Sequence, residues 1–264
     1  MKMHDVPGSG LERQRAIYGG DFYRSFRRLR WLFRFDCRYR ILIMEQLFAR
    51  RGIPFEGLKV FELGFGTGYL LKRFDWSCAI HGCELSPQAV EQLKIRSGME
   101  RYRELKLVCA GPEGEAVFPD RDYDLVIASH VLEHVPDDEE TLRRLAEHTR
   151  PGGYGLFFVP LERPNCSRSH HERTYSRPGF APLLERCGFE PLDLACNMRF
   201  DYYPNSLIIW LETRMPAAGY LAEGLANFFY SLWPIPLMQL VDRGLERCSC
   251  NPRQLAVLAR RKES

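Results

Sequence analysis

The sequence lacks the features that would assign it to a secreted, membrane-spanning or nucleic-acid-binding class. The formal net charge of its 264 residues is only +3, so nothing favours bulk binding to nucleic acid. Residues 225–241 carry no charge, but this run contains two prolines and is shorter than the roughly 20 residues that a spanning helix needs. The N-terminus, residues 1–5, lacks the apolar core of a signal peptide.

The nine cysteines are odd in number and include no C-x-x-C pair. Cys78, Cys83 and Cys109 fall in expected core strands, where free thiols behave as small apolar groups. This usage fits a reducing compartment better than a secreted disulfide framework, so we expect a cytoplasmic protein.

Apolar runs of strand length alternate with helical patterns from Leu58 onward. Strands that alternate with helices predict an α/β fold with a doubly wound, mostly parallel sheet, whose ligands bind at the carboxyl ends of the strands. The expected strands are 58–63, 78–84, 105–109, 123–129, 154–159, 188–195 and 254–259. The expected helices between them are 69–75, 86–97, 137–149 and 177–187.

A glycine-rich bend follows the first expected strand and is the most informative stretch of the sequence. Gly64, Gly66 and Gly68 stand at every second position. Glycine lets the backbone turn sharply and approach a ligand, because no Cβ blocks the way. We expect the backbone N–H groups at the start of the next helix, 69–75, to be free to face that ligand.

The spacing around this bend separates two ligand classes. The dinucleotide fingerprint G-x-G-x-x-G places a pyrophosphate on a helix N-terminus, whereas here Tyr69 stands where the third glycine should be. Glu62, two positions before Gly64, would repel a pyrophosphate but suits a ligand with an ammonium group. The pattern therefore disfavours an NAD(P)-dependent oxidoreductase, and a purely structural turn is the remaining alternative.

Glu84 ends the second expected strand, sixteen residues after Gly68. A carboxylate at this position can accept hydrogen bonds from two ribose hydroxyls, as in dinucleotide folds. It can also serve only as a favourable charge at a helix N-terminus. Because the glycine bend lies upstream, we favour the ribose, and hence an adenosine-type ligand.

Four ordered motifs over about residues 58 to 160 resemble those of class I S-adenosylmethionine-dependent methyltransferases of the small-molecule type (type 11/12-like). They are E-x-G-x-G-x-G at 62–68, the acidic strand end at Glu84, V-L-E-H-V-P-D at 131–137 and the P-G-G turn at 151–153. The resemblance implies a seven-stranded Rossmann-like sheet and S-adenosylmethionine as methyl donor. Residues 1–50 and 197–252 carry no match.

The resemblance also implies a set of donor-binding residues. Glu62 and the bend would hold the donor's amino-acid end, and Glu84 would hold its ribose. Leu85 would lie beside the adenine, with Ser129 and His130 beneath the sulfonium. The bend residues are Gly64, Phe65, Gly66, Thr67 and Gly68. The family's usual Gly-Asp pair is Gly111-Pro112 here, so Glu113, Glu115 or a backbone group would have to meet the adenine.

Methyl transfer from a sulfonium depends mainly on alignment, but an alcohol or phenol acceptor also needs a general base. Histidine suits that role, and the candidates are His130, His134 and His170, with His171 beside the last. The spacing of His170 and His171 from Cys166 matches no common zinc site, so we expect no metal. A catalytically silent binding module that kept the fold is the alternative reading.

The outer segments suggest a lid and a cap. Residues 1–51 carry twelve basic and five acidic residues, a net charge of +7. We divide the chain into a helical lid, 1–52, and a methyltransferase domain, 53–264, with an apolar cap inserted at 197–252. We expect the acceptor to be a small molecule, a glycan precursor or a lipid-linked compound, methylated at oxygen. The uncharged run 225–241 favours a bulky or membrane-associated acceptor. Whether the run forms a substrate pocket, a dimer surface or a peripheral membrane contact stays open, as does the choice between monomer and homodimer.

Overall fold

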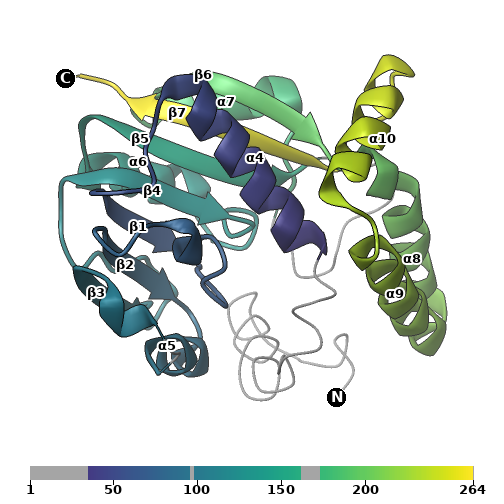
Figure 1. The fold of residues 1–264 in the computed structure, drawn as a ribbon, viewed down its shortest axis with the longest axis horizontal. Helices are drawn as coiled ribbons and strands as arrows, with labels where there is room; N and C mark the ends of the chain where they lie inside the picture. The colour runs from purple at the N-terminus through teal and green to yellow at the C-terminus, as the bar shows by residue number, and fades with distance from the viewer. Residues whose placement is uncertain (1–34, 96–97, 162–172, 264) are drawn as a thin grey trace.

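The computed structural model describes residues 35–95, 98–161 and 173–263, which form a seven-stranded sheet in the order β3-β2-β1-β4-β5-β7-β6 (Figure 1). β7 runs antiparallel to β5 and β6, and the remaining neighbours are parallel. The strands are β1 (Lys59–Leu63), β2 (Ala79–Glu84), β3 (Glu104–Cys109), β4 (Tyr123–Ser129), β5 (Thr149–Pro160), β6 (Phe189–Asn197) and β7 (Gln254–Arg261). The predicted seven-stranded, doubly wound and mostly parallel sheet is confirmed.

The sheet is buried on both faces, which explains why its strands are almost continuously apolar. Along β4, Leu125 and Ile127 face one core, whereas Val126 and Ala128 face the other. Helices α4 (Phe35–Arg51) and α5 (Pro87–Lys94) contribute to the first core. Helices α6 (Asp138–His148) and α7 (Arg177–Arg186) contribute to the second.

Three of these helices begin at a polar side chain that caps the first turn. Ser86, Asp137 and Ser176 each accept a hydrogen bond from the backbone N–H three residues further on. Such a cap satisfies a donor that the helix itself leaves unpaired. The helices predicted at 86–97, 137–149 and 177–187 are therefore confirmed, with shorter ends.

Two predicted elements differ in the structure. The helix predicted at 69–75 is wrong, because the bend continues to residue 70 and only a 3₁₀ turn, Leu71–Arg73, follows it. β5 begins at Thr149, ahead of the predicted 154–159, and its pairing with β4 shifts register between Tyr123 and Leu125. Gly152 adopts a φ of +71°, so the P-G-G sequence forms an irregularity inside the strand.

Three helices fill the segment between β6 and β7, where the sequence predicted a helical insertion. They are α8 (Tyr202–Arg214), α9 (Pro216–Ser231) and α10 (Ile235–Arg247). They lie at one end of the molecule next to α4 (Figure 1), and the ring of Phe35 lies 4.7 Å from that of Tyr230. Within the described residues, no helix combines the length and apolar character needed to cross a membrane.

Candidate functional site

The carboxyl ends of β1, β2 and β4 bring three predicted residues to one edge of the sheet. Glu62 lies next to last in β1, Glu84 ends β2 and Ser129 ends β4. β1 pairs with both of the other strands, so the three positions are neighbours. The strand order reverses at β1, and ligands of α/β sheets bind at such a switch point.

The Glu62 carboxyl is 1% exposed, and its Oε2 atom has no hydrogen-bond partner among the described residues. Burial raises the pKa of Glu62 well above its ordinary value, and the charge of Glu84 raises it further, although Arg40 opposes both. A buried polar atom without a partner costs free energy. Stability therefore does not explain this position, which fits a site that receives N–H donors from a ligand.

The Glu84 carboxylate is also buried, but it is well supplied with donors. It accepts hydrogen bonds from the backbone N–H groups of Gly66, Leu85 and Ser86, at 2.7, 2.8 and 3.2 Å. Burial raises the pKa of Glu84, and these three bonds partly oppose the shift. Leu85 is half-buried beside it. Glu84 thus ties the end of β2 to the glycine bend.

The N–H groups of the three glycines in the bend are used within the chain. The N–H groups of Gly64 and Gly68 donate to main-chain carbonyls, at 2.8 and 2.7 Å, and that of Gly66 donates to Glu84. The predicted helix start is absent. The carbonyl of Thr67 accepts a hydrogen bond from a lysine ammonium at 3.2 Å. The bend is therefore closed by bonds within the chain.

Close packing explains two of the three glycines. All three adopt a positive φ, at +69°, +53° and +66° along the chain. A Cβ on Gly64 would lie 2.3 Å from Cγ2 of Val131, and a Cβ on Gly68 would lie 2.7 Å from Cδ2 of Leu93. The ring of Phe65 is buried against Gly82, where a Cβ would approach it to 2.6 Å. The glycines thus hold the bend against β2, α5 and the segment after β4.

Arg40 of α4 belongs to the same edge and was missed as a site residue in the sequence. Its guanidinium is buried, donates to Oγ of Ser129 at 3.1 Å, pairs with Asp36 and lies over the ring of Tyr69. The Tyr69 hydroxyl lies 3.3 Å from the same Ser129 oxygen. The sequence did indicate that Arg40 is buried, because it lies on the apolar stripe of the helix that continues at positions 43, 44, 47 and 48.

His130 occupies a strained position directly after β4. Its φ is +54°, a value that residues other than glycine rarely adopt and that often marks functional turns. Its Nδ1 lies 3.1 Å from Oε1 of Glu133, and its Nε2 lies 2.6 Å from Oε1 of Gln254. Burial raises the pKa of Glu133, but the hydrogen bond and charge of His130, with the charge of His134, lower it to about 2.

The other predicted residues are scattered. His134 lies near Glu133, with 4.0 Å between Nε2 and Oε1. His170, His171 and Cys166 lie outside the described residues. In the turn after β3, the Glu115 carboxylate folds back over Gly111 and accepts from the N–H of Glu113 at 2.9 Å. Glu113 itself is exposed, so its predicted adenine contact remains a prediction.

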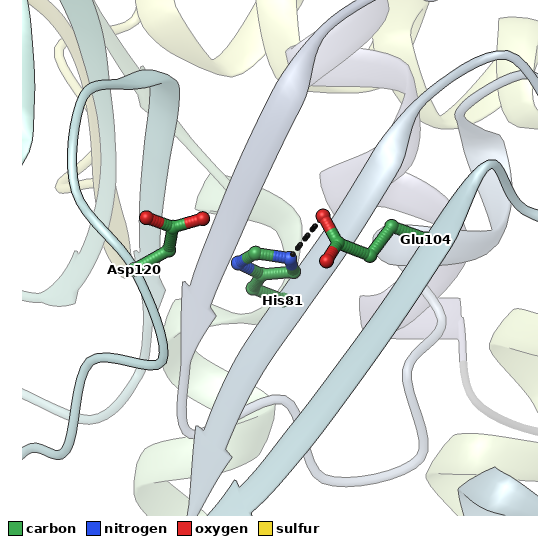
Figure 2. Close-up of side chains that lie close together, drawn as sticks. All are labelled: His81, Glu104 and Asp120. Atoms are coloured by element: carbon green, nitrogen blue, oxygen red, sulfur yellow. Dashed lines mark ion pairs between the residues drawn. The ribbon is translucent and has the colours of Figure 1, made fainter.

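A second cluster of titratable groups lies toward the opposite, amino end of the strands. Figure 2 shows His81 between Glu104 and Asp120, with Nε2 3.3 Å from an oxygen of Glu104. Lys106 pairs with Glu104 at 2.6 Å, and Lys59 pairs with Asp120 at 2.8 Å. Each carboxylate therefore already has a cationic partner, and the cluster acts as an ion-pair network between strands.

The strand order, the antiparallel last strand and the acidic residues on β1 and β2 define the Rossmann-like class I methyltransferase fold. Comparison with known proteins agrees. Residues 61–157 match the family model described as a methyltransferase domain. Residues 61–157 therefore carry a methyltransferase domain, and the sheet that contains them has the Rossmann-like topology of such domains.

Individual relatives are distant. The chain is 26% identical over 167 residues to aklanonic acid methyltransferase DauC of Streptomyces sp. (strain C5), covering 60% of this chain and 70% of that protein. It is 32% identical over 108 residues to ubiquinone biosynthesis O-methyltransferase of Nitrosospira multiformis, covering 40% and 44%. The solved structure of Haemonchus contortus phosphoethanolamine N-methyltransferase 2 with S-adenosyl-L-methionine gives a TM-score of 0.52 at 16% identity, covering 84% and 52%.

Proposed function

We propose that this protein transfers a methyl group from S-adenosylmethionine to an oxygen atom of a small-molecule or lipid-linked acceptor. When bound, the donor supplies a methyl group on a sulfonium, an activated leaving group. The match of residues 61–157 to the methyltransferase family model supports methyl transfer, and the relative named as an O-methyltransferase supports oxygen as the acceptor atom. The observation that carries the proposal is the buried Glu62 carboxyl, with an unpartnered oxygen at the sheet edge.

Two residues of opposite charge suit the amino-acid end of the donor. Glu62 would receive the ammonium group, because a cation beside a buried carboxylate restores the interaction that burial removes. We assign the donor's carboxylate to Arg40, whose guanidinium lies 3.1 Å from Ser129 and close enough to Glu62 to lower its pKa. Guanidinium groups pair with carboxylates through charge-assisted hydrogen bonds.

Glu84 remains our assignment for the ribose. A carboxylate has about four acceptor positions, and three of those on Glu84 are used by backbone N–H groups. A ribose hydroxyl can take the remaining position, and a second can replace the N–H of Gly66. Gly66 would then turn its N–H toward the ligand.

For an acceptor hydroxyl we assign the general base to Nε2 of His130. Burial and the charge of Arg40 lower the pKa of His130 more than Glu133 and Gln254 raise it, so the ring is neutral at neutral pH. A neutral ring carries one N–H, and the ionised Glu133 holds it at Nδ1. Nε2 then carries a lone pair 2.6 Å from the Gln254 oxygen, an unfavourable contact between two acceptors. An acceptor hydroxyl that displaces the Gln254 amide can donate to Nε2 and give up its proton.

The first test is ligand binding by the purified full chain. Isothermal titration should detect S-adenosylmethionine, and Glu62→Gln should weaken that binding at least about tenfold, because the amide no longer carries the charge that pairs with the ammonium. Stabilisation by NAD(P)H without S-adenosylmethionine binding would contradict the proposal in favour of an oxidoreductase. Tight donor binding without S-adenosylhomocysteine formation across alcohols, phenols and lipid-linked acceptors would favour a silent binding module.

A second test separates the two described histidines. His130→Asn should lower turnover of a hydroxyl acceptor by about 10²–10⁴-fold, the usual contribution of a general base, with a much smaller change in donor affinity. His134→Asn removes the neighbouring imidazole and should have a much smaller effect. Equal losses in the two variants, or a loss of donor binding in His130→Asn, would contradict this assignment.

A further inference from the structure

Helix α9 presents an apolar stripe to the outside. Its exposed large side chains recur at the helical spacing i, i+4, i+7 and i+8: Leu221, Leu225, Phe228 and Phe229. Leu232, the residue that caps the C-terminus of the helix, continues the spacing at i+11. Leu221, Leu225 and Phe229 are each at least 60% exposed. A surface helix normally turns such a stripe toward the core. The described protein leaves this one uncovered.

The two neighbouring helices extend the apolar surface. α8 packs along α9 and exposes Tyr203, Leu207 and Trp210 at i, i+4 and i+7. α10 exposes Leu237 and Leu240. A cavity of about 560 Å³, lined by apolar side chains of α9 and α10, lies on the same side and shares Leu225 and Phe229 with the stripe. We call these exposed residues of α8, α9 and α10 the cap face; apolar patches of this kind mark interaction sites.

Basic groups outnumber unpaired acidic groups around the cap face. On α10, Asp242 is buried and accepts from the Tyr39 hydroxyl and the Arg199 N–H, whereas Glu246 is exposed and pairs with Arg199 at 2.7 Å. Glu223 of α9 is half-buried. The arginines lie outside. Arg243 and Arg247 are exposed on α10, and the exposed Arg214 at the end of α8 lies 4.6 Å over the Trp210 ring.

We propose that the cap face docks on an anionic lipid bilayer, with α8 and α9 lying in the interface. Apolar side chains beside arginines are the composition of helices that lie in that interface. Tyrosine and tryptophan concentrate at the headgroup level, and each arginine near anionic lipid adds about 1 kcal/mol of attraction. Because no described helix can span a bilayer, the contact is peripheral. The inference does not depend on methyl transfer.

Vesicle flotation of the full chain tests this proposal. It should float with vesicles of phosphatidylcholine mixed with phosphatidylglycerol, and less with phosphatidylcholine alone. Leu221→Asp combined with Phe228→Asp should abolish flotation. Arg243→Glu combined with Arg247→Glu should weaken binding to the anionic vesicles at least about 25-fold, about fivefold for each arginine removed. The control is Ile95→Asp, a 78% exposed apolar residue at the end of α5, which should bind as the wild type does.

Two vesicle results would overturn the proposal. Absence of flotation with anionic vesicles overturns it, as does flotation of both cap-face variants at the wild-type level. A dimer in solution that Leu221→Asp and Phe228→Asp convert to monomers, without any vesicle binding by the wild type, would assign the cap face to a second copy of the chain. Circular dichroism of every variant checks that the fold is retained.

Discussion

At the scale of single residues, Glu62 is a buried acid that lacks one hydrogen-bond partner, which a ligand can supply. Its carboxyl is buried, lacks a partner at Oε2 and has a pKa raised by burial and by Glu84. Glu84, one strand away, has three N–H donors instead. Two acids at the same sheet edge therefore differ in their hydrogen-bond partners, and only the first would gain its missing interaction from a cation.

This difference predicts that donor binding releases a proton. In the free protein, Glu62 is protonated below its raised pKa, whereas beside an ammonium group it ionises. The affinity for the donor should therefore rise with pH up to the raised pKa of Glu62 and then level off. Titration calorimetry at about pH 6, below the α-amino pKa of about 7.7, should give heats that depend on the ionisation enthalpy of the buffer. Glu62→Gln should remove that dependence; buffer-independent heats in the wild type would contradict the prediction.

At the scale of elements, the glycine bend is held in place by close packing and by hydrogen bonds from its three glycine N–H groups. Its conformation is fixed by positive φ angles and by contacts that leave no space for a Cβ on Gly64 or Gly68. The bend therefore joins β1 to Val131 after β4 and to α5. A substitution in the bend should therefore displace β1, α5 and the segment after β4 together.

Gly64→Ala and Gly52→Ala form a matched pair that separates backbone strain from packing. Both glycines have positive φ, at +69° and +64°, but a Cβ on Gly52 meets nothing within 4 Å. Gly52→Ala should cost about 1–2 kcal/mol of unfolding free energy from the left-handed backbone alone. Gly64→Ala should cost about 1–3 kcal/mol more, because the short Val131 side chain cannot easily move away. Urea unfolding measures both, and equal losses would show that Val131 yields without cost.

Strand positions could be predicted from the sequence because each strand is an apolar run buried on both faces, as Leu125 to Ala128 show. The helix predicted at 69–75 failed because apolar residues in a bend resemble a helical stripe, and the bonds that close the bend are not visible in the sequence. Glu62 and Glu84 could be placed at one edge from topology alone. Arg40 could be placed on the buried stripe of α4 but not at this edge, because its position there depends on how α4 packs across the sheet.

At the scale of the whole molecule, α4 is the element that contacts both ends of the proposed machinery. Consecutive residues serve the two: the Tyr39 hydroxyl donates to Asp242 of α10 at 3.1 Å, and Arg40 donates to Ser129 at the sheet edge. Phe35 packs on Tyr230 of α9, and Phe200 packs on both Phe35 and Tyr39. The cap and the sheet edge are therefore joined through one rigid helix.

If both proposals hold, this connection predicts that lipid and donor influence each other. Donor affinity measured with and without saturating anionic vesicles should differ by about fivefold or more, the lower end of usual coupling energies. Tyr39→Phe, which removes the hydrogen bond to Asp242, should bring the two affinities closer together. Identical donor affinities for the wild type in both conditions would contradict the coupling.

The adjacency of Tyr39 and Arg40 has a consequence for how the enzyme would be controlled. Thermodynamic reciprocity requires that whatever a membrane does to cofactor affinity, the cofactor does to membrane residence by the same factor. A cell rich in methyl donor would then change how long each molecule stays on its lipid surface. The supply of methyl donor and the membrane location of the protein would then be coupled through neighbouring residues of one helix.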